Sequence, residues 1–203
     1  MDLKKYYQEK LDNALYGSER TKKKILYIST TRLAIFIAGF IALCFCYDQG
    51  GAVVGGILFG TLIPFLLLVK LHNRLFHRKD WYETSIRHYK AELASLENDH
   101  SAFDGGKEWM DASHPFSLDL DVFGEHSLFQ ALNRTCTPFG KETLSHWLRQ
   151  PLVKKEEIEK RQEAIRELSR HNDFRENFRI TGCLYKNNET GMKDLKEWVE
   201  TPS

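Results

Sequence analysis

The chain of 203 residues has room for one ordinary domain and an appendage. Its 29 basic and 28 acidic residues give a formal net charge of +1, so the overall charge does not indicate a nucleic-acid-binding protein. Apolar residues concentrate in the first third, and the remainder is strongly charged. The four cysteines are Cys44, Cys46, Cys136 and Cys183. They show no metal-ligand spacing, and Cys44 and Cys46 lie inside an apolar run, which suits buried small side chains. We expect no disulfide framework, and a reducing compartment is compatible with all four.

Residues 1–24 are predicted to form an amphipathic helix on the cytoplasmic side of a membrane. Its apolar side carries Leu3, Tyr7 and either Leu11 or Leu15. Lysines and acidic residues share the opposite side, and we expect the pair Gly17-Ser18 to break the helix. Two interpretations stay open: a solvated helix, or a helix that lies on anionic lipid headgroups.

Residues 25–79 are predicted to form a transmembrane helical hairpin. Two apolar runs without charged residues, 33–47 and 52–69, are separated by a predicted turn at Asp48-Gln49-Gly50-Gly51. The second run is close to the ~20 residues that a helix needs to cross a bilayer. The first helix can begin earlier, with Arg32 reaching toward the headgroups. The alternative is a hairpin buried in the core of a soluble protein.

Small residues recur every four positions in both runs, which favours close approach of the two backbones. They are Ala34, Ala38 and Ala42 in the first run, and Gly51, Gly55, Gly56 and Gly60 in the second. We expect Pro64 to kink the second helix. Basic residues flank both runs, whereas the connecting turn carries only Asp48, so the positive-inside rule predicts that both termini are cytoplasmic.

Residues 80–100 are predicted to form a linker helix with a heptad pattern. Its apolar positions step by four and three residues: Tyr82, Ile86, Tyr89, Leu93 and Leu96. Such a stripe either dimerises as a coiled coil or packs within the chain, and two heptads favour packing within the chain. Residues 101–113 contain Gly105-Gly106 and lack a period, so we expect a loop that separates the anchor from the core.

Residues 101–203 are predicted to form an all-α core. One short helix carries Leu128 and Leu132, and a second begins at Thr137-Pro138 with a capping hydroxyl and a proline in its first turn. Pro151 ends that helix, and a third begins near Lys155. The residues expected to face inward are Leu144, Trp147, Leu148, Ile158, Ile165 and Leu168. Further helices are expected around Phe174 and Phe178 and around Leu195, Trp198 and Val199.

No catalytic, cofactor-binding or metal site is predicted in this chain. The Gly140-Lys141 pair lacks the upstream glycine of a phosphate loop, and Glu142 stands where a magnesium-binding hydroxyl is needed. The eight histidines lack metal spacing. We interpret Asp119 and Asp121 as turn or capping residues, and we expect Arg134 and Arg161 to form ion pairs with them.

The ordered features of residues 114–168 resemble the start of the helical core domain of MutS-type mismatch-repair ATPases. The matching residues are Ser127-Leu128, Leu132-Asn133-Arg134-Thr135, Thr137, Gly140, Leu144, Trp147-Leu148, Pro151-Leu152, Ile158 and Arg161. No mismatch-reading domain precedes them, and the predicted anchor stands there instead. The chain is therefore most similar to the MutS-related membrane proteins of bacteria, which implies a two-pass protein of the bacterial inner membrane.

The resemblance implies that this chain is the anchor and the incomplete core domain of a longer ATPase. ATP and Mg²⁺ would bind downstream of this chain, a homodimer would form through regions beyond it, and DNA could be contacted only through downstream domains. The lipid bilayer is the partner expected for the chain itself. The alternative is a non-enzymatic membrane adaptor that presents a helical bundle for protein interactions. A phosphate loop encoded past Ser203 would favour the ATPase, and a stop codon there would favour the adaptor.

Overall fold

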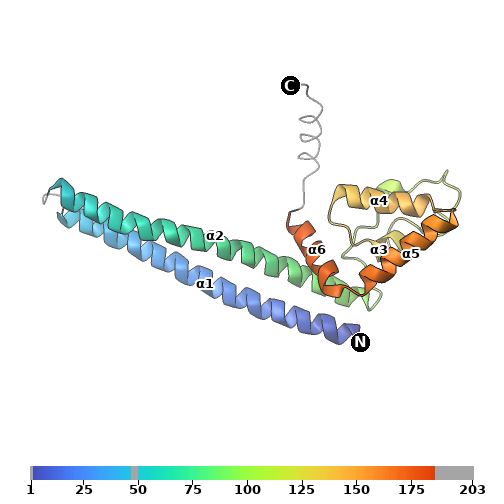
Figure 1. Cartoon of the computed structure of the whole chain (residues 1–203), viewed down its shortest axis with the longest axis horizontal. Coiled ribbons are helices and arrows are strands. Elements are labelled where there is room, and N and C mark those ends of the chain that lie inside the picture. The colour runs from blue at the N-terminus through green and yellow to red at the C-terminus, as the bar shows by residue number, and fades with distance from the viewer. Residues whose placement is uncertain (1, 47–49, 186–203) are drawn as a thin grey trace, which may run out of the picture. The chain divides into compact units, whose positions relative to one another are not determined.

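A computed structural model describes residues 2–46 and 50–185, and it divides the chain into two compact units. Residues 9–86 form the first unit that we describe, and residues 1–8 together with 87–203 form the second. Every regular element in the described residues is helical, as the all-α prediction requires (Figure 1). The helices are α1 (Leu3–Cys46), α2 (Gly51–Ser95), α3 (Leu128–Leu132), α4 (Pro138–Arg149), α5 (Lys155–Ser169) and α6 (Asn172–Leu184), with a short 3-10 helix at Lys107–Trp109.

Within residues 9–86, α1 and α2 lie side by side as an antiparallel hairpin (Figure 1). The break predicted at Gly17-Ser18 is wrong, because α1 continues through both residues. A Cβ atom on Gly17 would lie 2.4 Å from the ring of Tyr82, so this glycine allows a close approach of the two helices. The boundary predicted between residues 79 and 80 does not interrupt α2, which also continues through Pro64.

Close packing in the apolar part of the hairpin occurs at a residue outside the predicted small-residue pattern. Gly39 is buried, and a Cβ atom there would lie 2.4 Å from Cγ2 of Thr61. Ala34 and Ala38 are exposed, and a Cβ atom on Gly60 would meet nothing within 4 Å. The predicted small-residue stripe therefore does not make the closest contact between the two helices.

Both helices are long and apolar enough to cross a membrane. Their most apolar 18-residue windows have mean hydropathies of 1.9 in α1 and 2.5 in α2. Only 11% of the first window and 0% of the second is buried within the protein. The helices of a soluble core would be mostly buried, so this exposure does not favour the buried-hairpin alternative. The turn predicted at Asp48-Gln49 falls outside the described residues.

The second unit has a small aromatic core around the start of the predicted bundle. Val122, Phe123 and Phe129 are buried together. The partly buried side chains that pack on them are Trp109, Phe116, Leu144 and Leu148. The segment 101–113, predicted as a separating loop, is irregular apart from its 3-10 helix. It contributes Trp109 to this core. Gly124 also donates a backbone hydrogen bond of 2.8 Å to the carbonyl of Gly105 in this segment.

The predicted limits of α4 and the predicted start of α5 near Lys155 are confirmed. Ser127 caps α3 by accepting a hydrogen bond from the amide of Gln130, and Thr137 caps α4 by accepting one from Gly140. Helix α4 has its proline in the first turn and ends before Pro151, as the sequence predicts.

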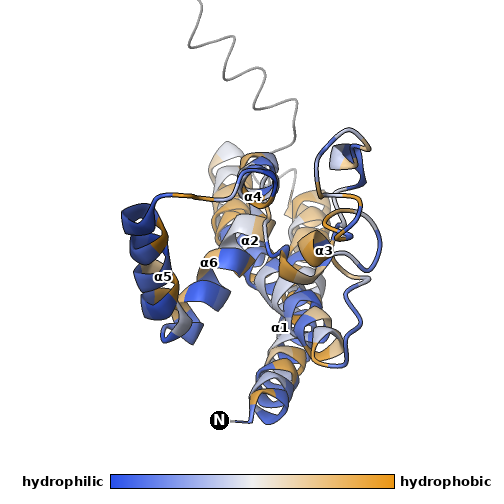
Figure 2. Cartoon of the chain, turned by 90° about the vertical axis from the view of Figure 1, so that its right-hand side faces the viewer, coloured by the Kyte–Doolittle hydropathy of each residue, from blue (hydrophilic) through white to orange (hydrophobic). Residues whose placement is uncertain are grey.

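The predicted inward face of α5 is wrong. Ile165 is 61% exposed and Leu168 is 45% exposed, and α5 has no buried residue. Figure 2 shows this helix as largely hydrophilic. On α6 the rings of Phe174 and Phe178 stack on each other at 5.9 Å but stay exposed. The further helix predicted at Leu195–Val199 lies outside the described residues.

We expect Gly39→Val to destabilise the hairpin and Gly60→Val to leave its packing intact. The valine at position 39 must displace Thr61, whereas the valine at position 60 enters open space. Overpacking of this kind costs about 1–3 kcal/mol. Thermal unfolding followed by circular dichroism in detergent micelles measures the difference. Equal melting temperatures for the two variants would contradict the Gly39–Thr61 contact.

Candidate functional site: a partly buried charge cluster

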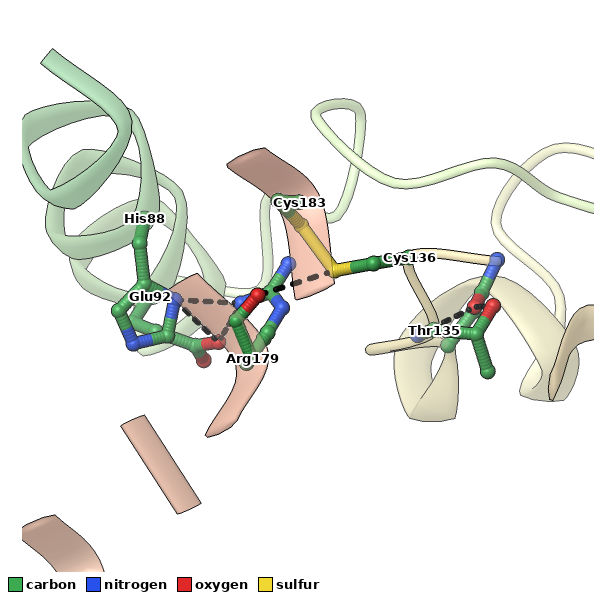
Figure 3. Close-up of a disulfide and its surroundings, with 7 residues drawn as sticks. His88, Glu92, Thr135, Cys136, Arg179 and Cys183 are labelled. Atoms are coloured by element: carbon green, nitrogen blue, oxygen red, sulfur yellow. Dashed lines mark hydrogen bonds and ion pairs between the residues drawn. A yellow bond between two sulfur atoms is a disulfide. The ribbon is translucent and has the colours of Figure 1, made fainter. Parts of the chain in front are cut away.

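One carboxylate of α2 pairs with two arginines from other parts of the second unit. Glu92 Oε1 lies 2.8 Å from Nε of Arg134, which follows α3, and 2.7 Å from a terminal guanidinium nitrogen of Arg179 on α6. His88, one turn before Glu92, accepts a hydrogen bond of 2.6 Å from Arg179 at its Nδ1 atom. We call these four residues the Glu92 cluster, and Figure 3 shows His88, Glu92 and Arg179 of it.

Both arginines of the Glu92 cluster lie over one aromatic ring. The guanidinium of Arg134 lies 3.7 Å from the centroid of the Phe103 ring, and that of Arg179 lies 5.2 Å from it. Phe103 is buried. Arg134 also donates to Ser95 at 2.9 Å, near the end of α2. Stacking of guanidinium groups on an aromatic face adds to the pairing with Glu92 and orients both arginines.

Burial keeps His88 neutral. Desolvation, reinforced by the positive charges of Arg179 and Arg134, lowers the pKa of His88 to about 3. A neutral ring agrees with Nδ1 acting as an acceptor toward Arg179, and it places the ring proton on Nε2. The contact of 3.7 Å between His88 and Glu92 is therefore not an ion pair near neutral pH. Burial and the nearby charge of Arg134 also lower the pKa of Arg179, while Glu92 opposes this shift.

A neighbouring pair adds a second contact between α2 and α6. The hydroxyl of Tyr89 donates to Glu176 at 3.2 Å, and both residues are buried. The Tyr89 ring also lies 6.4 Å from that of Tyr7, in the first turns of α1. Tyr89 belongs to the predicted heptad stripe, so at this position the stripe packs within the chain.

A disulfide joins α6 to the segment between α3 and α4. Cys136 and Cys183 are bonded, with their Cα atoms 5.0 Å apart, and the sulfur of Cys136 lies 3.3 Å from the carbonyl oxygen of Arg179 (Figure 3). The expectation of no disulfide framework is therefore wrong for this pair. Their separation of 47 residues is compatible with many folds, and only the return of α6 to this segment brings the two residues together.

The ion pairs predicted for the two arginines are wrong. Arg134 pairs with Glu92, and Arg161 lies over the ring of Trp147 at 4.2 Å. Asp119 and Asp121 lie in a turn, as predicted. The signal that sequence reasoning missed was the pair His88 and Glu92, which lie one turn apart within the heptad segment.

Lys141, the lysine of the Gly140-Lys141 pair, is held in ion pairs with neighbouring carboxylates. Lys141 forms ion pairs with Asp104 and Glu108, and its ammonium group lies 5.1 Å from the Trp109 ring. Across residues 2–46 and 50–185, no group of three His, Cys, Asp or Glu side chains could hold a metal ion. The ion pairs of the Glu92 cluster connect α2 to α6 and to the segment that follows α3.

Comparison with known proteins finds one family model that matches residues 112–203. Residues 112–203 match the family described as MutS domain III. The MutS-related prediction made from residues 114–168 is thereby confirmed. Arg134, Cys136, Arg179 and Cys183 lie inside the matched range, whereas His88 and Glu92 precede it. The Glu92 cluster therefore joins α2 to a MutS-like domain.

Several DNA mismatch repair proteins are similar to parts of the chain. MutS of Caldanaerobacter subterraneus is 45% identical over 60 residues, which are 30% of this chain and 7% of that protein. MSH6 of Saccharomyces cerevisiae is 30% identical over 135 residues, which are 66% of this chain and 10% of that protein. MSH3 of Lodderomyces elongisporus is 39% identical over 80 residues, or 36% of this chain and 8% of that protein.

The chain thus matches a tenth or less of the length of these relatives. They come from bacteria and from yeasts, so the similarity does not favour a bacterial source. No solved structure matches the chain.

Replacing Glu92 by glutamine should destabilise the second unit strongly. The side chain is 13% exposed, and the substitution leaves Arg134 and Arg179 without their counter-charge. Removing one partner of a fully buried ion pair costs about 3–5 kcal/mol, and because these three side chains are 13–29% exposed, we expect a loss below that range. Chemical denaturation measures the loss. Glu97→Gln, which removes an exposed partner of Lys4, is the matched control and should stay near wild type. Equal stability of the two variants would contradict the role of the Glu92 cluster.

A fall in pH should destabilise the wild-type protein more than it destabilises the His88→Asn variant. The unfolded histidine takes up a proton below its ordinary pKa of 6.5, whereas the folded ring stays neutral down to a pKa of about 3. Folding stability is therefore lost as the pH falls through this window, by about 2 kcal/mol between about pH 7 and about pH 5. Asparagine keeps an acceptor for Arg179 and does not titrate. Chemical denaturation at both pH values gives the change in the free energy of unfolding for each protein. An identical change in the two proteins would show that His88 is not buried as described.

Proposed function

Because this chain is MutS-related through residues 112–203, we propose that it attaches a MutS-type protein to a lipid bilayer. In this proposal α1 and α2 cross the bilayer, and the MutS domain III is presented on one side of it. One observation supports the proposal above the others. Helix α2 contains both the more apolar candidate span and the residues His88 and Glu92, which bind the arginines of the MutS-like domain.

The side chains of the candidate spans fit a lipid environment. Large apolar residues of both helices are exposed, among them Phe36 and Phe40 at 61% each in α1, and Phe59 at 68% in α2. Exposed apolar surface on this scale is unfavourable in water and favourable in hydrocarbon. Arg32 lies over the ring of Phe65 at 5.7 Å, a contact that accommodates a charge near the edge of the bilayer.

The flanking charges suggest that both ends of the hairpin lie on the cytoplasmic side. Lys22, Lys23 and Lys24 precede the first apolar run, and Lys70 and Arg74 follow the second. By the positive-inside rule these groups stay in the cytoplasm, and anionic headgroups attract them. The second unit would then lie in the cytoplasm as well.

The activity of the whole protein is part of the proposal. The relatives are named as DNA mismatch repair proteins, and the chain matches 7–10% of the first three. We propose that ATP and Mg²⁺ are bound by a module outside residues 1–203, because no phosphate loop occurs in this sequence. Homodimerisation and any contact with DNA would also arise outside this chain. Within residues 1–203, the Glu92 cluster would transmit force between α2 and the MutS-like domain.

A membrane adaptor without enzymatic activity is the second candidate. The exposed, stacked pair of Phe174 and Phe178 favours it, because such a pair suits a protein contact. Immunoprecipitation from solubilised membranes of the source organism, with an antibody against this chain, separates the two candidates. Mg²⁺-dependent ATP hydrolysis in the precipitate supports the MutS-type machine, and its absence supports the adaptor.

Membrane attachment is tested by expressing the chain with its candidate spans intact or interrupted. Wild type should float with membranes on a density gradient and resist extraction with alkaline carbonate. The variant Leu62→Asp/Leu66→Asp places two charges in the second span and should be extracted, since a charge at the bilayer centre costs about 3 kcal/mol. Leu118→Asp/Leu120→Asp, at exposed positions of the second unit, is the matched control. Release of the wild type by carbonate would refute the anchor.

A further inference from the structure

A groove of about 430 Å³ is lined by both helices of the hairpin, at the end where each helix changes from charged to apolar sequence. We call it the basic groove. Its α1 residues recur at steps of three and four, so they share one face of that helix. One helix supplies the cations of the groove, and the other supplies an apolar wall. The lining residues are Arg20, Lys23, Lys24, Tyr27 and Ile28 of α1, with Leu71 and Leu75 of α2.

The three cations of the basic groove are exposed and are not paired with carboxylates of the hairpin. In the described part of the chain, none of them lies within ion-pair distance of an Asp or Glu. The neighbouring Lys22 differs, because it lies 3.8 Å from Glu19 and 3.9 Å from Glu83. Like charges on one helix face repel one another, so an anion placed among the three cations is attracted by all of them.

The apolar part of the basic groove lies next to the candidate spans. Tyr27 precedes the first apolar run and Leu71 follows the second. Both side chains are accessible, with Tyr27 73% and Leu71 44% exposed. In the proposed orientation this level is the boundary between headgroups and hydrocarbon, where tyrosine is enriched. A ligand that fits the groove therefore carries an anionic group directly beside an apolar one.

We propose that the basic groove binds the headgroup of an anionic phospholipid of the cytoplasmic leaflet. Its phosphate lies among Arg20, Lys23 and Lys24, and the first methylenes of its acyl chains contact Leu71 and Leu75. Guanidinium and ammonium groups donate to phosphate oxygens in charge-assisted hydrogen bonds. A zwitterionic phospholipid brings its own cation into the cluster and therefore binds more weakly. This inference rests on the proposed membrane attachment and adds a lipid preference to it.

Basic residues beside a membrane also attract anionic lipids diffusely, without a site. Lys70 and Arg74 allow the two cases to be separated. They lie at the same end of the hairpin and are exposed, but they are not among the lining residues of the basic groove. Diffuse attraction predicts that removing these two charges weakens lipid binding as much as removing two charges of the groove. A headgroup site predicts that only the groove charges matter.

The experiment measures lipid binding to the 203-residue chain in detergent micelles by native mass spectrometry. Phosphatidylglycerol, which is anionic, and phosphatidylcholine, which is zwitterionic, are titrated with matched acyl chains. We expect one phosphatidylglycerol to bind saturably and roughly tenfold more tightly than phosphatidylcholine, because each basic residue at a membrane surface raises the affinity for anionic lipid about fivefold. An excess of soluble glycerol 3-phosphate should not displace the lipid, since it lacks the apolar chains.

Two variants that each lose two positive charges test the position of the site. Lys23→Gln/Lys24→Gln should lower the preference for phosphatidylglycerol to about threefold or less, because one groove cation remains. Lys70→Gln/Arg74→Gln is the matched control and should keep the roughly tenfold preference. Circular dichroism checks that both variants are as helical as the wild type.

Three results would overturn the headgroup site. They are equal affinities of the wild type for the two lipids, equal losses in the two variants, and displacement by glycerol 3-phosphate, which would identify a soluble anion as the ligand. Extraction with alkaline carbonate keeps these results apart from the test of the anchor. A wild type that resists carbonate and yet binds both lipids equally refutes the site and leaves the anchor supported. Release by carbonate refutes the anchor, and the inference with it.

Discussion

The pairing of Glu92 with two arginines is the interaction on which the second unit depends. A single carboxylate that is 13% exposed forms ion pairs with both Arg134 and Arg179, which come from separate parts of the chain. Burying charges is costly unless they are paired and hydrogen-bonded, so the three groups must stay together once water is excluded. Stacking of both arginines on Phe103 and the acceptor nitrogen of His88 then determine the directions of the guanidinium groups.

This arrangement explains how a region with few buried apolar residues is held. The aromatic core includes Phe129 of α3 and is covered by Leu144 and Leu148 of α4. By contrast, α5 has no buried residue and α6 buries only Glu176 and Ile180. Helix α6 is therefore attached by polar contacts, namely the pairs of Arg179 and Glu176 with α2, and by the disulfide. Polar attachments depend on pH, and a disulfide depends on the redox state, whereas a large apolar core responds to neither. A MutS-like domain held in this way can respond to its surroundings.

Several elements were predictable because their causes are local. The capped beginnings of α3 and α4, and the end of α4 before Pro151, follow from groups a few residues apart in the chain. The apolar runs of α1 and α2 and the MutS resemblance are also visible in the order of residues. Predictions that depended on a contact with a residue far away in the sequence were wrong more often. Gly17 was interpreted as a helix break although it makes room for Tyr82, and Arg134 was paired with nearby aspartates although its partner is Glu92, 42 residues earlier.

By itself the sequence determined the helical class, the limits of α4, the start of α5 and the kinship of residues 114–168 with MutS proteins, because these depend on spacing along the chain and on groups within one or two turns. Only the tertiary structure decided which glycine lets the hairpin helices touch, which carboxylate binds Arg134 and Arg179, and which two cysteines bond. Those outcomes depend on distances between residues far apart in the chain. Such distances are set when helices pack, and a pattern along one segment contains no information about them.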